Sequence, residues 1–103
     1  MKSVVWTAEA KIRLREIQTY IGEHDPKAAQ QVVRRLLEQS KTLGDLPLSG
    51  RQVPEFRQDD LRELLVRPYR LIYRVRDEQV QILTVKHYRQ RLPKHANRLS
   101  DRH

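Results

Sequence analysis

The chain has 103 residues and a mass of 12.4 kDa, so it is long enough for one domain and too short for two. Hydrophobic residues make up 38% of it and charged residues 33%, which excludes a chain without a core. The lack of cysteine excludes disulfides, thiolate metal sites and a cysteine nucleophile. No apolar run approaches the roughly 20 residues of a membrane span, and the first residues lack a secretion signal, so we expect a soluble, cytoplasmic protein.

Basic residues are in excess, with 21 Lys and Arg against 13 Asp and Glu, a net charge of +8 and a pI near 10.3. The excess lies in residues 46–103, whereas residues 7–45 are nearly balanced. A surface of this kind attracts RNA, DNA or an acidic protein. The alternative is that the charge serves solubility alone.

The N-terminal segment predicts a strand followed by a helix. Residues 3–6 are β-branched and aromatic, and Thr7 is a good N-cap for a helix that runs to about Glu23. The apolar stripe of that helix repeats at helical spacing through Ala10, Leu14, Ile17 and Ile21.

A second helix is predicted to start at Asp25-Pro26, because Asp caps free amides and Pro suits the first helical position. It runs to about Leu43, and Gly44 stands where a left-handed C-cap is expected. The two helices should form an antiparallel hairpin.

The second half of the chain predicts a loop followed by strands. Residues 45–54 contain two prolines and a glycine and therefore form a loop. Three strands follow, with breaks at 67–68 and 77–78, over residues 62–66, 69–76 and 79–87. The fold class is α+β in the order β-α-α-β-β-β, a helical hairpin packed on a small twisted antiparallel sheet. We expect a single domain over residues 1–103 with a basic, partly mobile tail over residues 92–103.

The register of the last hairpin decides which side chains share a face. If Asp77 and Glu78 are the turn, the pairs are Val75 with Val80, Ile72 with Leu83, and Arg70 with Val85. Arg70, Arg74 and His87 then line an open, positively charged face beside exposed Ile72, Leu83 and Val85, and the helices cover the opposite face. A one-residue change in the loop would put His87 on the side opposite Arg70.

A candidate catalytic set consists of Glu55, Arg70, His87 and Tyr88. Such a set suits RNA cleavage: Glu55 or His87 is the base, Arg70 stabilises the charged phosphorane, and His87 or Tyr88 assists the leaving group. The structural alternative is that Glu55 is a solvated loop acid, that the arginines pair with Glu63 or Asp77, and that His87 and Tyr88 cap a strand.

Metal and nucleotide sites are not predicted. The four histidines lack ligand spacing, and the three glycines are scattered at positions 22, 44 and 50, with no phosphate-binding loop. We therefore expect no metal and no cofactor.

The chain resembles the RelE/ParE superfamily of toxins from type II toxin–antitoxin modules, over nearly its whole length. The resemblance rests on the opening strand with its first helix, Asp25-Pro26 before Ala28-Ala29, Leu46-Pro47-x-x-Gly50-Arg51-x-x-Pro54-Glu55, Arg62-Glu63-Leu64-Leu65-Val66, Tyr69-Arg70-Leu71-Ile72-Tyr73-Arg74-Val75, Ile82-Leu83-x-Val85-x-His87 and Arg91-Leu92-Pro93. It implies the same helical hairpin on a sheet, and toxicity blocked by a cognate antitoxin.

The resemblance implies two possible targets. ParE-like members poison DNA gyrase, and we favour that branch because three blocks look more like it: Pro47-x-x-Gly50-Arg51, Arg62-Glu63-Leu64-Leu65-Val66 and Asp25-Pro26-x-Ala28-Ala29. RelE-like members cleave mRNA on the ribosome, and Glu55, Arg70, His87 and Tyr88 match the catalytic positions of the YoeB-type RNases. Tyr88 departs from the ParE branch, which often has a small residue there. A third interpretation is a plain basic nucleic-acid-binding module.

The partner surfaces are predicted from charge. Target- or antitoxin-binding residues are expected to be Arg51, Arg70, Arg74, Lys86, Arg89 and Arg91. On the gyrase interpretation, exposed helix faces around Arg13, Glu16, Arg34 and Arg35 join the basic C-terminal strand and tail in the contact. The antitoxin should carry an acidic, amphipathic C-terminal segment that lies on the outer face of the sheet.

Overall fold

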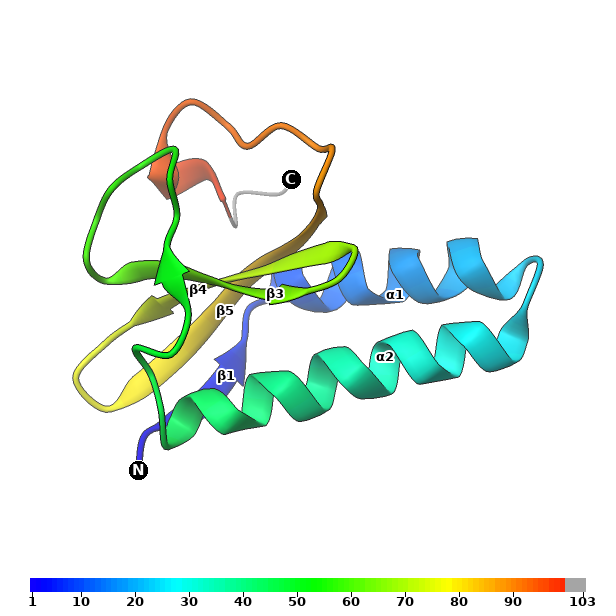
Figure 1. The fold of residues 1–103 in the computed structure, drawn as a ribbon, viewed down its shortest axis with the longest axis horizontal. Coiled ribbons are helices and arrows are strands. Elements are labelled where there is room, and N and C mark those ends of the chain that lie inside the picture. The colour runs from blue at the N-terminus through cyan, green and yellow to red at the C-terminus, as the bar shows by residue number, and fades with distance from the viewer. Residues whose placement is uncertain (100–103) are drawn as a thin grey trace.

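The computed structural model describes residues 1–99, in which two helices lie against one face of a five-stranded sheet (Figure 1). The elements are β1 (Ser3–Trp6), α1 (Ala8–Gly22), α2 (Pro26–Lys41), the 3-10 turn η1 (Thr42–Gly44), β2 (Arg51–Gln52), β3 (Leu61–Val66), β4 (Tyr69–Val75), β5 (Gln79–His87) and the 3-10 turn η2 (Ala96–Arg98). The predicted α+β fold is confirmed. Among these residues, no helix has the length and hydrophobicity needed to cross a membrane.

The sheet has the strand order β1-β5-β4-β3-β2. Neighbouring strands are antiparallel except for β1, which pairs parallel to β5 through Ser3 to Trp6 against Gln79 to Ile82. Strand β2 was not predicted, because its two residues lie in a segment rich in proline and glycine that has no strand pattern of its own.

Both helices begin where the sequence predicts. The Thr7 Oγ1 accepts a hydrogen bond from the Ala10 amide at 3.2 Å, and the Asp25 Oδ1 accepts one from the Ala28 amide at 3.1 Å. The helices run antiparallel and side by side along one face of the sheet, which gives the predicted hairpin (Figure 1).

The predicted end of the second helix is wrong in its detail. Helix α2 ends at Lys41 and passes into η1, and no glycine among residues 1–99 has a positive φ, so Gly44 is not a left-handed cap. Its lack of a side chain matters for a different reason. A Cβ at Gly44 would lie 2.6 Å from the Lys2 carbonyl oxygen, while the Lys2 amide donates to the Gly44 carbonyl at 2.9 Å.

The predicted register of the β4–β5 hairpin is correct at the turn and wrong beyond it. Val75 pairs with Val80 as expected, but a β-bulge follows, so that Tyr73 pairs with Ile82 and Ile72 with Thr84. The extra residue, Leu83, shifts every later pair by one position. His87 therefore pairs with Tyr69, and the side chain of His87 moves to the helix-covered face.

Two apolar clusters pack against the two faces. The helix-covered cluster includes the fully buried Leu36, Leu71, Tyr73, Val80, Ile82 and Val85. The outer cluster consists of Val53, Leu61, Ile72, Leu83 and Leu99, with Phe56, Leu92 and Ala96 against it. The expectation of an open outer face with exposed Ile72, Leu83 and Val85 is therefore wrong: the loop after β2 and the segment after β5 cover that face, and the bulge turns Val85 toward the helices.

The C-terminal segment, expected to be partly mobile, packs on the outer cluster as far as Leu99, whose side chain is buried. Residues 100–103, the rest of the predicted tail, lie outside the described residues.

Candidate functional site

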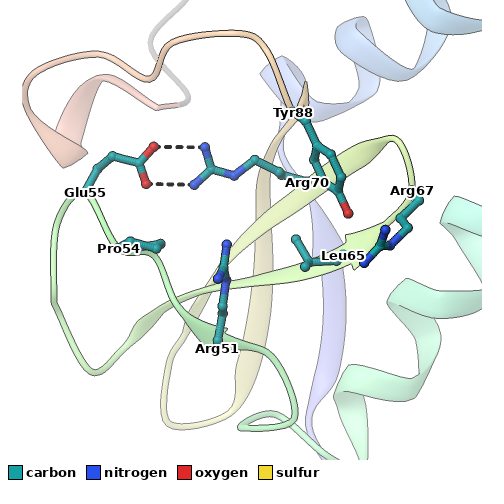
Figure 2. A pocket seen from close by; sticks show the side chains of 7 residues that line it. All are labelled: Arg51, Pro54, Glu55, Leu65, Arg67, Arg70 and Tyr88. Carbon is teal, nitrogen blue, oxygen red and sulfur yellow. Dashed lines mark hydrogen bonds and ion pairs between the residues drawn. The ribbon is translucent and has the colours of Figure 1, made fainter.

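A hollow of about 400 Å³ lies on the outer side of the sheet, where β2, β3 and β4 meet the segment after β5 (Figure 2). Its lining joins residues from four separate parts of the chain: Arg51, Pro54, Glu55, Leu65, Arg67, Arg70 and Tyr88. Three of the four candidate catalytic residues therefore share one site.

Gly50 and Tyr73 place the β2 segment. The buried Tyr73 hydroxyl accepts a hydrogen bond from the Gly50 amide at 3.0 Å and donates to the Pro47 carbonyl at 2.8 Å. A Cβ at Gly50 would lie 2.5 Å from the Glu63 carbonyl oxygen, so only glycine fits this close approach. The next residue, Arg51, is then paired with Glu63 across β2 and β3. The Pro-x-x-Gly-Arg block is thus a packing motif that positions an arginine.

A chain of alternating charges runs through the site. Glu63 is buried on β3, and its Oε2 accepts from the Nε and Nη2 of Arg51, each at 2.7 Å. Its Oε1 accepts from the Nε of Arg70 at 2.7 Å and lies 2.5 Å from Nη2. The outer edge of the Arg70 guanidinium meets the Glu55 carboxylate in two parallel hydrogen bonds of 2.9 and 2.8 Å (Figure 2). The order is Arg51, Glu63, Arg70, Glu55.

These contacts set the ionisation of the exposed acid. Hydrogen bonds from Arg70 lower the pKa of Glu55 below its ordinary value, and the same bonds raise the pKa of Arg70. Glu55 is therefore a stable carboxylate and a weak base at neutral pH, and Arg70 keeps its charge.

Of the two adjacent residues predicted as acids, only Tyr88 reaches the hollow. Its side chain lines the hollow beside Arg70, and the residue as a whole is 38% exposed (Figure 2). His87 lies on the opposite side of the sheet, where its ring meets Tyr69 edge to face with centroids 5.8 Å apart. The predicted sharing of one face by Arg70 and His87 is wrong because the bulge at Leu83 reverses the alternation between them.

The contacts of His87 stabilise the turn of residues 87–90 that follows β5. Its Nδ1 accepts from the Arg89 amide at 3.1 Å, and its own amide donates to Gln90 Oε1 at 2.8 Å. That oxygen also accepts from Arg13 Nη2 at 3.0 Å, which ties the turn to α1. Arg13, expected on an exposed helix face, has a side chain only 19% exposed because it is engaged here and with Glu16.

The remaining predicted binding residues do not form one surface. Arg74 lies farther along β4 and pairs with Asp60 at 2.8 Å. Lys86 is the cross-strand neighbour of Arg70. Arg89 lines a hollow on the α1 side together with His87, and Arg91 is exposed in the segment after β5. Whether any of these residues binds a partner stays a prediction.

Glu63 is the central residue that sequence reasoning placed only in a surface pair. Within β3, Leu61 and Glu63 alternate with Arg62 and Leu64, which indicates that Glu63 points to the same face as the buried Leu61. The alternation was visible in the sequence, but its partner Arg51 lies across a strand that the sequence does not predict. Among residues 1–99, no group of three or more His, Cys, Asp or Glu side chains is arranged to hold a metal ion.

Comparisons with known proteins find toxins and chains of toxin–antitoxin systems. Residues 4–92 match the family described as the ParE toxin of the type II toxin–antitoxin system, parDE. The chain is 40% identical over 94 residues to "Putative toxin Y4kP" of Sinorhizobium fredii, which covers 89% of this chain and 94% of that protein. It is 39% identical over 88 residues to "Toxin RelE2" of Caulobacter vibrioides, covering 84% of this chain and 96% of that protein.

Two solved structures have the same fold. A chain of the chromosomal ParDE toxin–antitoxin system from P. aeruginosa superposes with a TM-score of 0.72 and 29% identity. A chain of the toxin–antitoxin complex RelBE2 from Mycobacterium tuberculosis superposes with a TM-score of 0.58 and 25% identity. Each match covers 84% of this chain and 96% of the other.

Proposed function

Because the chain belongs to the ParE toxin family of type II toxin–antitoxin systems, we propose that it acts by binding and poisoning DNA gyrase, and that a cognate antitoxin neutralises it. The observation that carries the choice of target is the separation of the RNA-cleavage residues. His87 lies on the other side of the sheet from Arg70, against the ring of Tyr69.

Chemistry at the hollow supports binding rather than cleavage. A general base works best when its pKa lies near the operating pH, and the pKa of Glu55 is lowered instead. The outward donors of Arg70 are occupied by Glu55, so contact with a phosphate at this site requires that Glu55 leave first. Of the predicted acids and bases, Glu55 and Tyr88 lie beside Arg70, whereas His87 does not.

A binding toxin needs accessible charge, and the described chain offers it away from the hollow. Arg34 on α2 is exposed, and so are Arg89 and Arg91 after β5. A chain with no nucleotide-binding motif inhibits an ATP-driven topoisomerase by occupying it, so its product is a trapped complex of gyrase with cleaved DNA.

We assign antitoxin binding to the helical hairpin, in place of the outer face of the sheet that the sequence predicted. The outer cluster is already covered, but Leu37 of α2 is 38% exposed and lines two adjoining hollows of about 450 and 480 Å³. The cations around them are Lys11, Arg15, Arg34 and Lys41, against the single acid Glu38. This combination fits an acidic, amphipathic segment.

The two hollows that share Leu37 together form a groove, which we call the antitoxin groove, and the edge of β1 lies beside it. The amides of Ser3 and Thr7 bond to β5, so Val4 and Trp6 turn their backbone groups toward the side where the sheet ends. Val4, Val5 and Trp6 also line the hollow next to Leu37. An extended part of the antitoxin could add a strand at this edge and bury apolar side chains between the helices.

Two parallel assays test the choice of target. Purified protein should inhibit supercoiling by gyrase and accumulate cleaved DNA, and it should leave mRNA intact on translating ribosomes. A circular dichroism spectrum of the same preparation establishes that the protein is folded. Cleaved mRNA together with unaffected gyrase would overturn the proposal.

An mRNA endoribonuclease remains the second candidate, because Glu55, Arg70 and Tyr88 surround one hollow. It requires release of Arg70 from Glu55 and an acid other than His87. Under this interpretation Tyr88→Phe should reduce cleavage on ribosomes at least 100-fold. Under the gyrase proposal the same variant should remain toxic.

The antitoxin groove is tested with a matched pair of leucines. Leu37→Glu places a charge in the groove, whereas Leu46→Glu changes a leucine that is 62% exposed and lines neither hollow. We expect L37E to weaken binding of the co-expressed neighbouring gene product at least tenfold and L46E to change it less than twofold. Equal effects would exclude the groove.

A further inference from the structure

The Arg70 guanidinium presents a two-pronged donor edge at the mouth of the hollow. Its Nη1 and Nη2 reach the two oxygens of Glu55 at 2.9 and 2.8 Å, which is also the geometry in which arginine binds two oxygens of a phosphate. Glu55 occupies the position that an external oxyanion would take (Figure 2).

The inner edge of Arg70 is held independently of Glu55. Nε and Nη2 remain bonded to the Glu63 Oε1, and the Glu63 carboxylate is fixed on its other side by Arg51. The Glu63 side chain is completely buried, and that of Arg70 is 9% exposed. Departure of Glu55 would leave the donor edge ordered and aimed at solvent, so no reorganisation of Arg70 is needed to accept another anion.

Glu55 itself is free to leave. It lies on the exposed loop after β2, its side chain is 43% exposed, and its ion-pair partner among residues 1–99 is Arg70. Because the Glu55 carboxylate is exposed, solvent anions reach this ion pair, and Glu55 can exchange with one of them without a change in the sheet.

The walls of the hollow favour a nucleic-acid strand over a simple anion. Arg51, with a side chain 59% exposed, and the exposed Arg67 flank Arg70. Once Glu55 has turned away, these three arginines face one buried carboxylate, which leaves an excess of positive charge. Tyr88 and Leu65 add an exposed phenol ring and an apolar floor on which a base can stack.

We propose that this hollow is a gated phosphate-binding site for a strand of DNA, in which Glu55 is the resident anion that the phosphate displaces and Tyr88 stacks on an adjacent base. The phosphate is bound and no bond is cleaved. The choice of DNA rests on the proposed gyrase target, because gyrase would present DNA to its inhibitor. The site itself is defined without gyrase, so the two can fail separately.

The test is a fluorescence anisotropy titration of the full chain with labelled single-stranded oligonucleotides of DNA and of RNA. Glu55→Gln removes the resident anion, and we expect it to tighten DNA binding about three- to tenfold. Asp59→Asn is the matched control: it makes the same change in net charge on the same loop, but Asp59 bonds to Gln52 and not to Arg70. We expect D59N to change binding less than twofold.

Two further variants locate the ligand. Adding Arg51→Gln to E55Q should return the affinity to the wild-type value or below, and adding Tyr88→Leu should remove at least half of the gain. Equal tightening by E55Q and D59N would overturn the site, because it would show only the effect of net charge. Stronger binding of RNA than of DNA would overturn the DNA assignment.

The wild-type chain provides a check that does not depend on a variant's folding. Pyrophosphate should shift the NMR resonance of the Arg70 Nε–H group and compete with the oligonucleotide, while the Arg13 Nε–H group, which bonds to the Val85 carbonyl across the sheet, should stay unchanged. No shift at Arg70 when the oligonucleotide is saturated would contradict the proposal. A positive result with gyrase and a negative one here would leave the gyrase target standing and remove this site.

Discussion

The two faces of the sheet are held in different ways. The helix-covered face is apolar and joins regular elements, with Leu36 of α2 and Leu71 of β4 fully buried. The outer face is covered by irregular segments. It carries a smaller apolar cluster and, beside that cluster, the chain of ion pairs from Arg51 to Glu55. Apolar packing and a few side-chain hydrogen bonds, such as that of Arg13 to the Val85 carbonyl, hold the first face, whereas the second also depends on ion pairs between loop and sheet.

This difference separates apolar packing from ionic contacts within one small domain. A buried ionic chain costs desolvation, and replacing it with apolar side chains is often neutral or stabilising. The chain of ion pairs here ends at the exposed Glu55 carboxylate, and it holds the Arg70 guanidinium in one orientation next to solvent. The helix-covered face joins the helices to the sheet through apolar contacts, and the outer face carries the buried ion pairs.

The largest contrast between the faces should come from Glu63. Glu63→Ala leaves Arg70 buried without its inner anion, and we expect a loss of about 3–5 kcal/mol in the free energy of unfolding, measured with urea. Leu36→Ala on the helix-covered face should cost about 2–5 kcal/mol through a cavity. Only the Glu63 variant should show a changed dependence of stability on salt. A cost below about 1 kcal/mol for E63A would contradict a structural role of the charge chain.

The glycine at the start of β2 gives a second test. In Gly50→Ala the new Cβ would meet the Glu63 carbonyl and the Tyr73 hydroxyl, so we expect a loss of about 1–3 kcal/mol in thermal or urea unfolding. Gly22→Ala is the control, because its Cβ would only touch Ala29 at 3.7 Å at the end of α1. It should be neutral or stabilising by up to about 1 kcal/mol. Equal destabilisation by both variants would contradict the close approach at Gly50.

His87 tests whether its imidazole is needed as an acid or as a hydrogen-bond acceptor. His87→Ala loses the bond from the Arg89 amide and should cost about 0.5–1.5 kcal/mol of stability. His87→Asn keeps an acceptor at a similar position and should recover most of that loss. Both variants should remain toxic in cells. Loss of toxicity in a folded H87N would restore His87 to the catalytic list.

The smallest expected effect is the pH dependence of the Glu55–Arg70 pair. The pKa of Glu55 is lowered in the folded chain, so its contribution to stability is present above the unfolded pKa and disappears as pH falls through the folded pKa. Between pH 7 and pH 3 the wild type should therefore lose more stability than Glu55→Gln. Because the carboxylate is partly exposed, we expect the difference to be below about 1 kcal/mol in urea unfolding. A larger loss in E55Q than in the wild type would have the wrong sign.

The sequence predicts the regular elements well and the outer face poorly, for physical reasons. Caps at Thr7 and Asp25 and the apolar stripes act within one helix, so the local sequence suffices to locate the helices. The burial of the outer face depends on contacts between residues far apart in the chain, such as Leu99 on Ile72, which no periodicity reveals.

The sequence predicted only part of the candidate site, because the site also depends on how distant strands pair. Glu55, Arg70 and Tyr88 do meet, but His87 does not, because one bulge residue reverses the alternation of β5. The burial of the residues of β5 shows the effect of that bulge. Val80, Ile82 and Val85 cannot share one face by strict alternation, yet all three are buried in the same cluster.

The most direct test of the account is the conversion of supercoiled plasmid to linear DNA by gyrase and ATP in the presence of this chain. We predict that linear DNA accumulates with the wild type and to within about threefold with His87→Asn, because His87 does not act as an acid or a base. The gyrase proposal would be contradicted if neither protein produced linear DNA while the wild type, and not the His87 variant, cleaved mRNA on ribosomes.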